Sequence, residues 1–220
     1  MTNDFVKRVC TMNYLVLIVC VASASAELMQ MKAGLQLAKN LPGVVIDVGA
    51  NGGKETKLAL SYGRKVVAVE CLASAYAKLL KEYGALNTVV VLHVCASAST
   101  SVQTLYLADD SSSLIANNVA SGAERQKALR AHNVLRHNRE MIVTAPLDDL
   151  ITNSSQVALI KMDVQGAEPQ VFQGAARIIK QNRPVLIYED NPGFAKLSQI
   201  ELPPGYRCRV INGDKVCNFN

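Results

Sequence analysis

The sequence predicts an α/β fold, a doubly wound and mostly parallel β-sheet with helices on both faces. Short apolar segments rich in β-branched residues alternate with helical segments, which is typical of consecutive βαβ units. These segments lack the polar alternation of half-solvated strands, as expected where helices cover both faces of a sheet. The chain has 220 residues, of which 50% are hydrophobic and 19% charged. It is therefore apolar enough to bury a core and long enough for one domain.

The first half of the chain supplies three of the predicted strands. An amphipathic helix is expected over 27–40, and Pro42-Gly43 follows it as a stop signal. The run VVIDV at 44–48 predicts a buried strand. A glycine-rich turn and a helix over 54–62 come next, then a strand over 65–70, a helix over 73–83 that stops at Gly84, and a strand over 88–96. Right-handed crossovers restrict these elements to a doubly wound topology.

The alternation breaks between 97 and 145, which indicates an insertion or cap over one end of the sheet. This part contains a predicted strand over 102–108 and an arginine-rich helix over 122–139. We interpret that helix as a solvated face rather than an anion-binding surface. The alternation returns with a strand over 156–164, a helix over 169–181 and a strand over 184–189. One domain therefore covers 27–220.

A β-hairpin is predicted at the C-terminus, because Asn212-Gly213 is the strongest short signal for a two-residue type I′ turn. Counting outward from this turn places Cys208 opposite Cys217, as a pair without mutual backbone hydrogen bonds. The Cα atoms of such a pair lie ~4.5 Å apart, within the range of a disulfide. We therefore predict a Cys208–Cys217 disulfide if the chain is secreted.

The N-terminus has the pattern of a secretory signal peptide over 1–26. Lys7 and Arg8 precede an apolar run over 9–22, and Ala24-Ser25-Ala26 forms a cleavage site. The run is short for a spanning helix, which needs ~20 apolar residues; an uncleaved signal anchor is the alternative. The expected location is the secretory pathway or the outside of the cell, with membrane attachment only if this segment is an anchor.

Polar residues at the strand ends indicate the ligand, because a doubly wound sheet binds ligands at the carboxyl ends of its strands. The glycines after the first strand let a ligand approach the backbone closely. Asn51 holds the position where a dinucleotide fingerprint needs glycine, which disfavours NAD. Asp47 suits a ligand with an ammonium group, and Glu70 can accept hydrogen bonds from two ribose hydroxyls. An ammonium group and a ribose without a pyrophosphate describe S-adenosylmethionine.

Other chemistries find no support in the sequence. It contains neither a Gly-x-Ser-x-Gly nucleophile elbow nor a P-loop lysine, which argues against acyl and phosphoryl transfer. The net charge of +5 is too small to indicate a nucleic-acid partner. The three histidines lack metal-ligand spacing, and Asp163 with Glu189 is no metal motif by itself, so we expect no metal.

Six segments, in the expected order over about 43–190, resemble the FkbM-type family of S-adenosylmethionine-dependent methyltransferases. The most specific is IKMDVQGAE at 160–168, which is similar to the I-K-[IM]-D-V-E-G-A-E run of that family. The others are VVIDVGANGG at 44–53, VVAVE at 66–70, SSSL at 111–114, PLDDL at 146–150 and PVLIYED at 184–190. The resemblance implies a Rossmann-like, doubly wound sheet of seven strands, with the C-terminal hairpin predicted above, and S-adenosylmethionine as the cofactor.

The resemblance also implies roles for the residues at the strand ends. Asp163 would face the methyl-transfer centre and is the candidate general base, with orientation of the cofactor or capping of the next helix as the alternative. Independently of the resemblance, Glu168 and Glu189 are candidates for binding hydroxyl groups of the substrate or a cation, or else form ion pairs with Lys161 or Arg183. The cofactor would contact Asp47, Gly49, Asn51 and Gly53 at its methionine end, Glu70 at its ribose, and Ala96 and its neighbours at its adenine. Ala50, Cys71 and Cys95 are further candidates for contact with the cofactor.

Two functions are compatible with these observations. Family enzymes mostly methylate hydroxyl oxygens, which predicts an O-methyltransferase for a glycan or a small metabolite. Three features depart from the family: Gln165 stands where it usually has Glu, Cys71 stands where Pro is common, and a signal segment is present although S-adenosylmethionine is made in the cytosol. The O-methyltransferase is the leading hypothesis. The signal segment and Gln165 motivate the alternative, a secreted or lumenal binding module that keeps the fold without turnover.

Overall fold

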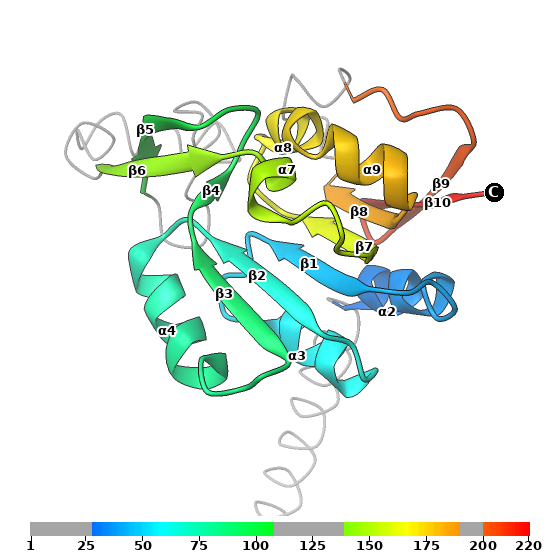
Figure 1. Cartoon of the computed structure of the whole chain (residues 1–220), viewed down its shortest axis with the longest axis horizontal. Coiled ribbons are helices and arrows are strands. Elements are labelled where there is room, and N and C mark those ends of the chain that lie inside the picture. The colour runs from blue at the N-terminus through cyan, green and yellow to red at the C-terminus, as the bar shows by residue number, and fades with distance from the viewer. Residues whose placement is uncertain (1–27, 108–138, 190–199) are drawn as a thin grey trace, which may run out of the picture.

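The computed structural model describes residues 28–107, 139–189 and 200–220 (Figure 1). The predicted signal segment 1–26, the SSSL segment at 111–114 and nearly all of the predicted helix 122–139 lie outside the described residues. The elements are α2 (Met29–Leu37), β1 (Val44–Val48), α3 (Lys54–Ser61), β2 (Val66–Glu70), α4 (Ala73–Tyr83), β3 (Val89–His93), β4 (Cys95–Ala96), β5 (Ser101–Tyr106), β6 (Arg139–Ala145), α7 (Leu147–Leu150), β7 (Val157–Met162), α8 (Glu168–Gly174), α9 (Ala176–Asn182), β8 (Val185–Glu189), β9 (Tyr206–Ile211) and β10 (Asp214–Phe219).

Seven strands form the main sheet, in the order β3-β2-β1-β7-β8-β10-β9. The strands from β3 to β8 run parallel, and β10 is antiparallel to both of its neighbours. Along the chain, β2 and β3 follow β1 on one side of it, whereas β7 and β8 lie on its other side. The order of the strands therefore reverses at β1. The structure therefore confirms the predicted seven-stranded, mostly parallel sheet, and it places the point of reversed strand order between β1 and β7.

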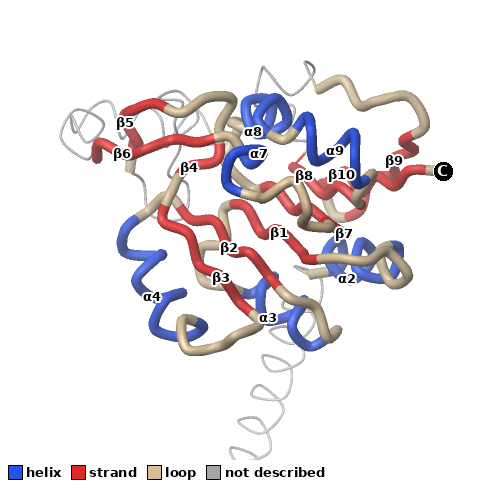
Figure 2. Tube along the Cα trace, in the orientation of Figure 1, coloured by secondary structure: helices blue, strands red, loops and turns tan. Residues whose placement is uncertain are grey.

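Helices cover both faces of this sheet, as the continuously apolar strands predict (Figures 1 and 2). The helices α2, α3 and α4 pack on one face, where α2 contributes Met31 and Leu35 to a cluster with Leu159 and Ile187 of the sheet. The helices α7, α8 and α9 pack on the other face. All six residues of the central strand β7 are buried.

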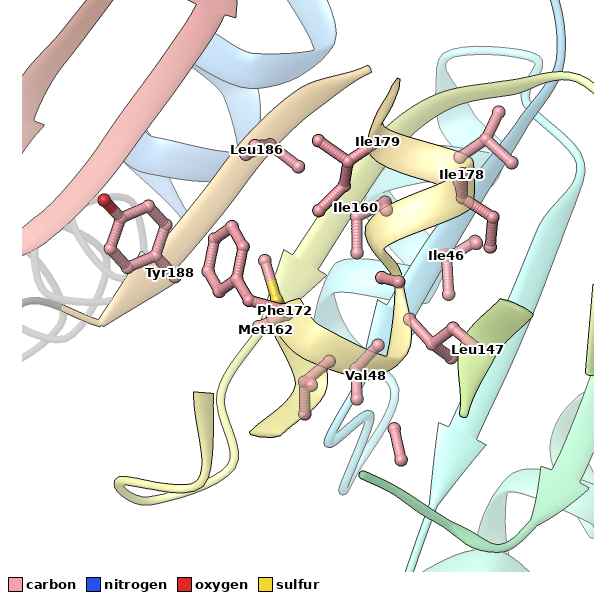
Figure 3. Close-up of a cluster of buried hydrophobic side chains, with 14 of the residues drawn as sticks. Ile46, Val48, Leu147, Ile160, Met162, Phe172, Ile178, Ile179, Leu186 and Tyr188 are labelled. Carbon is pink, nitrogen blue, oxygen red and sulfur yellow. The ribbon is translucent and has the colours of Figure 1, made fainter. Parts of the chain in front are cut away.

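The larger core cluster lies between the sheet and the helices α8 and α9 (Figure 3). Ile178 and Phe172 of these helices lie over Ile160 and Leu186 of the sheet, and the ring of Phe172 meets the edge of Tyr188 with centroids 5.1 Å apart. Each fully buried aliphatic side chain of this kind stabilises the fold by about 1.5–3 kcal/mol. This packing fixes the ends of β7 and β8, and with them the segment after β7.

A second sheet of three strands, in the order β4-β6-β5, stands next to the main sheet. The sequence predicts one strand over 88–96, but the structure divides it. The strand β3 ends at His93, and Cys95 and Ala96 pair with Thr144 and Ala145 of β6 instead. The apolar pattern of the sequence continues through Val94, so it does not predict that the chain leaves the main sheet there. Both β5 and β6 come from the part of the chain that we interpret as an insertion.

The predicted helix over 169–181 is also divided, into α8 and α9, with Ala175 between them at φ −114°. A Cβ at Gly174 would overlap the carbonyl oxygen of Ser97 and crowd the Cα of Pro146. The break therefore lies where the helix passes close to the backbone of another segment. The hydrophobic pattern of the sequence continues through this position, so it does not predict the break in the helix.

The C-terminal hairpin has the predicted register. Asn212 and Gly213 form the turn with φ values of 57° and 93°, as a type I′ turn requires. Ile211 faces Asp214 and Cys208 faces Cys217. The structure contains the Cys208–Cys217 disulfide, with Cα atoms 4.0 Å apart. Within the described residues, no helix is both long and apolar enough to cross a membrane.

Candidate active site

A pocket opens at the carboxyl ends of β1, β2 and β7, where the order of the strands reverses. Its empty volume is about 710 Å³, counting the space open to solvent. Seven of the residues predicted for the site line it: Gly49, Asn51, Glu70, Cys71, Cys95, Ala96 and Asp163. The other lining residues are mostly apolar: Val48, Val69, Leu72, Ala75, Val94, Leu105, Val164, Gln165 and Ala167.

The turn after β1 packs directly on the backbone that follows β7. Gly49 has a φ of 75°, and a Cβ at this position would overlap the carbonyl oxygen of Asp163. The N–H of Asp163 donates a hydrogen bond of 3.0 Å to the carbonyl oxygen of Val48. Close approach of two backbone segments thus requires glycine here, independently of any ligand.

Alanine at Gly49 is expected to lower the free energy of unfolding by more than about 2 kcal/mol, because the methyl group must displace the end of β7 and the positive φ is strained. Gly52→Ala is the matched control: it lies in the same turn, a Cβ there meets no atom within 4 Å, and a change within about 0.5 kcal/mol is expected. Urea denaturation measures both. Equal midpoints for the two variants would contradict the close packing of the turn.

Glu70 is a carboxylate of the pocket wall that backbone hydrogen bonds hold in place. It lies at the end of β2 and is 7% exposed. The N–H of Asn51 donates to its Oε2 at 2.8 Å, and the N–H of Leu72 donates to its Oε1 at 2.7 Å. Each carboxylate oxygen keeps a further lone pair for a ligand. Two backbone segments thus hold a bidentate acceptor at the pocket wall before any ligand binds.

Three of the predicted cofactor contacts do not line the pocket. Asp47 is fully buried in β1 and faces α3, where the hydroxyl of Thr56 donates to its Oδ2 at 2.7 Å. Ala50 is 1% exposed and packs against α4. Gly53 lies against the ring of Tyr83, whose hydroxyl donates to its carbonyl oxygen at 3.2 Å. These residues shape the loop from beneath, and direct contact with a cofactor stays a prediction for them.

Lys161 joins the buried side of the site to its open side. Its Nζ lies 3.8 Å from Oδ1 of Asp47 and 3.6 Å from Oδ2 of Asp163. Burial disfavours the charged ammonium group, but the nearby carboxylates outweigh this and raise the pKa of Lys161. Burial also raises the pKa of Asp47 to about 6. Lys161 is the one charged residue of β7, and that interruption of an apolar strand is the sequence signal that would have identified it.

Asp163 is the acidic group that faces the open part of the pocket. Its side chain is 46% exposed, and its Oδ1 accepts a hydrogen bond of 2.8 Å from Nε2 of Gln165. Gln165 has a φ of 54° and lies in the short turn after β7. A glutamate at this position, as the family usually has, would bring a second carboxylate beside Asp163 instead of an amide donor. The departure at Gln165 therefore changes the charge next to the candidate base.

Glu168 and Glu189, the candidates for binding the substrate, do not line the pocket. Glu168 begins α8 and is fully buried, and its Oε1 accepts a hydrogen bond of 3.0 Å from the N–H of Val164. Burial, with Glu189 and Asp163 nearby, raises the pKa of Glu168 to about 7. This hydrogen bond to Val164 stabilises the turn after β7. In the described parts of the chain, no three His, Cys, Asp or Glu side chains gather as a metal site requires.

The raised pKa of Glu168 predicts a pH dependence of stability. The native state binds this proton more tightly than the unfolded chain, whose ordinary glutamate value is 4.5. The free energy of unfolding should therefore fall as the pH rises from about 4.5 to about 7. Glu168→Gln keeps the acceptor for Val164 and removes the charge, so at pH 8 it should be more stable than the wild type by roughly 3 kcal/mol.

Urea denaturation at pH 5 and pH 8 measures this effect. The difference between the wild type and Glu168→Gln isolates Glu168 from the other buried carboxyls. Asp149→Asn, an exposed carboxylate on α7, is the control and should leave the pH dependence unchanged. If the curves of the wild type and Glu168→Gln run parallel, the buried acid is not the cause.

A second disulfide joins Cys71 and Cys95, with Cα atoms 4.6 Å apart. Both residues line the pocket. The sequence pattern predicts both near the cofactor but does not predict their pairing. Cys71 directly follows β2, and Cys95 begins β4. Their pairing depends on the change of sheet at Val94, which the sequence pattern does not reveal. The two cysteines are separated by 24 positions in the sequence. A disulfide that closes a loop of this length stabilises a fold by about 3 kcal/mol.

Comparison with known proteins gives a solved structure of similar fold. It is the crystal structure of methyltransferase FkbM from Methylobacillus flagellatus KT, with a TM-score of 0.52 and 18% identity over 81% of this chain. This chain spans 43% of that protein. A mutant of MtNAS has a TM-score of 0.45 and 14% identity, over 89% of this chain and 60% of its own. TrmN from Thermus thermophilus has a TM-score of 0.37 and 14% identity, over 86% and 48%. These two TM-scores are below 0.5, so the two similarities support no further conclusion.

The sequence itself gives the stronger result. No curated protein matches it significantly. The model of the methyltransferase FkbM domain, however, matches residues 47–202, well over half of the chain. This match includes the turn after β1, Glu70, the segment after β7 and Glu189. The chain therefore belongs to the FkbM methyltransferase family.

Proposed function

We propose that the pocket binds S-adenosylmethionine and that the chain transfers the methyl group to a hydroxyl oxygen of a glycan or a small metabolite. Membership of a methyltransferase family supports this cofactor. The observation that carries the proposal is the carboxylate of Glu70, held by the N–H groups of Asn51 and Leu72. It matches two adjacent hydroxyl donors, and a ribose offers such a pair.

The surroundings of Glu70 fit the nucleoside half of that cofactor. The wall beside it is apolar and includes Leu72, Ala75, Val94 and Leu105. A flat apolar base is stabilised by burial against such side chains, at about 25 cal/mol for each Å² removed from water. The carboxylate would hold the ribose and the apolar wall would hold the adenine. This order agrees with the positions that the family resemblance implies.

The other end of the pocket fits a cation. Asp163 presents its carboxylate there, half exposed, and Gly49 lies against the backbone of Asp163. S-adenosylmethionine carries a sulfonium and an ammonium group, and a nearby carboxylate favours both. The side chain of Lys161 stays beneath, 5% exposed, between Asp47 and Asp163. It partly balances the buried negative charge without entering the pocket.

Asp163 is the proposed general base. The cofactor supplies an activated methyl group, and the protein supplies alignment and a place for the proton that the acceptor hydroxyl loses. Gln165 holds one oxygen of the carboxylate and Lys161 lies near the other, so the side chain is oriented toward the pocket before the acceptor arrives. General bases contribute typically about 10²–10⁴-fold to a rate.

We further propose that the protein works in an oxidising compartment. The signal pattern at 1–26 supports this location, and so do the disulfides Cys71–Cys95 and Cys208–Cys217, because disulfides persist mainly where thiols are oxidised. Such a location requires import of the cofactor.

Titration calorimetry with S-adenosylmethionine and S-adenosylhomocysteine tests the proposal on the purified full chain. Saturable binding of both at one site is expected, together with transfer of a labelled methyl group to one member of a panel of glycans and hydroxylated metabolites. Absence of binding would reject the proposed cofactor. Binding without transfer to any acceptor would favour the alternative of a binding module.

A further inference from the structure

We propose that the Cys71–Cys95 disulfide is a positioning element of the cofactor pocket, so that cofactor affinity depends on the oxidation state of this pair. The inference rests on the proposed function, because its ligand is the nucleoside half of S-adenosylmethionine. The proposal assigns a role in cofactor binding to Cys71 and Cys95, in addition to Glu70, which would bind the ribose, and Asp163, the candidate base.

The bond lies next to the group that receives the ribose. Cys71 stands between Glu70 and Leu72, and the N–H of Leu72 donates to Oε1 of Glu70 at 2.7 Å. The carbonyl oxygen of Cys71 lies 3.1 Å from Nε2 of His93, at the end of β3. The conformation of Cys71 therefore sets both the path of the backbone after β2 and the donor that orients Glu70.

The other half of the bond belongs to the apolar wall. Cys95 is 1% exposed and packs in a cluster with Leu105 and Ile142 of the three-stranded sheet. Cys71 and Leu72 pack against the same cluster from the main sheet. The disulfide thus joins the ribose acceptor to the adenine wall by a covalent bond, at the place where Val94 connects the main sheet to the three-stranded sheet. Two thiols cannot approach as closely as two bonded sulfurs, so reduction changes the packing where the two walls meet and removes the covalent link between them.

The two sulfurs differ in access. Cys71 is half-buried and Cys95 is buried. A dithiol reductant should therefore attack Cys71, forming a mixed disulfide with it while the sulfur of Cys95 leaves and takes up a proton. The second thiol of the reductant then releases Cys71 as a thiol and closes its own disulfide. The protein pair gains two electrons and two protons, and the dithiol loses the same.

The experiment compares ligand affinity in the oxidised and the reduced protein. Cys208→Ala/Cys217→Ala, in the full chain, removes the hairpin disulfide and leaves the pocket unchanged. Calorimetry with S-adenosylhomocysteine and with 5′-methylthioadenosine is run before and after treatment with dithiothreitol, and peptide mapping reports which cysteines are paired. Because the bond lies at the nucleoside end, reduction should weaken both ligands by a similar factor of about tenfold or more.

A reciprocal measurement uses the same protein without any pocket substitution. If the disulfide form binds S-adenosylhomocysteine more tightly by some factor, saturating ligand must shift the reduction equilibrium toward the disulfide by that factor. Cys71→Ser/Cys95→Ser should have the low affinity of the reduced protein and no response to dithiothreitol. Loss of its fold, seen by circular dichroism, would leave the reciprocal measurement to decide.

Three outcomes are distinguishable. Equal affinities of the oxidised and reduced protein, within twofold, would overturn the inference and leave the proposed function intact. Weakening of S-adenosylhomocysteine alone, with 5′-methylthioadenosine unchanged, would also overturn it, since the effect would then lie at the methionine end. An oxidised protein that binds neither ligand would reject the proposed function, and the inference with it.

Discussion

Alanine at Glu70 is expected to weaken the binding of S-adenosylmethionine by at least about 100-fold. Hydrogen bonds to a charged group contribute about 1.5–3 kcal/mol each, and each 1.4 kcal/mol is a tenfold change in affinity. Loss of two such bonds to a ribose therefore accounts for the expected effect. The N–H groups of Asn51 and Leu72 would also lose their acceptor. Titration calorimetry measures the affinity.

Glu82→Ala is the control, because Glu82 is an exposed glutamate on α4 outside the pocket. It should bind the cofactor as the wild type does. Glu70→Gln should also bind the cofactor weakly. The oxygen of the amide can accept a hydrogen bond from one of the two backbone N–H groups, but its NH₂ group would then face the other N–H group, and two donors cannot pair. A change of less than threefold for Glu70→Ala would show that the ribose does not bind there.

Asparagine at Asp163 is expected to lower the rate of methyl transfer by about 10²–10⁴-fold, with less than about tenfold loss of cofactor affinity. The amide keeps an oxygen for Gln165 but cannot accept the proton of a hydroxyl. The single-turnover rate at saturating cofactor measures this, with an acceptor identified from the panel. Gln165→Ala should have a smaller effect, because Gln165 only orients the carboxylate.

The two measurements separate the roles that the sequence leaves open for Asp163. A lost rate with retained affinity indicates the general base. A lost affinity with an unchanged saturating rate indicates a residue that orients the cofactor. An unchanged rate and affinity would contradict both roles.

Much of the fold follows from local patterns. The register of the hairpin is set by the Asn212-Gly213 turn alone, and counting from it pairs Cys208 with Cys217 correctly. The order of strands and helices follows from apolar segments that helices cover on both sides. Because parallel strands bring their carboxyl ends to one edge, Glu70 and Asp163 are predicted at one pocket, and both line it.

The rest depends on contacts between distant segments. The pairing of Cys71 with Cys95 requires β4 to leave the main sheet, and the break at Ala175 follows the close approach of Gly174 to Ser97. Asp47 illustrates a different limit. Its residue type suits a ligand cation, but its place in β1 turns it toward α3 and Lys161. Residue type alone does not distinguish a pocket carboxylate from a buried partner beneath the pocket.

The most direct test of the proposed cofactor site is a crystal structure of the protein with S-adenosylhomocysteine at saturating concentration. We expect that both ribose hydroxyls donate to the carboxylate of Glu70 and that the adenine lies against Leu72 and Leu105. The sulfur should lie on the side of Asp163. A nucleoside bound elsewhere, or a ribose without contact to Glu70, would contradict the proposed cofactor site.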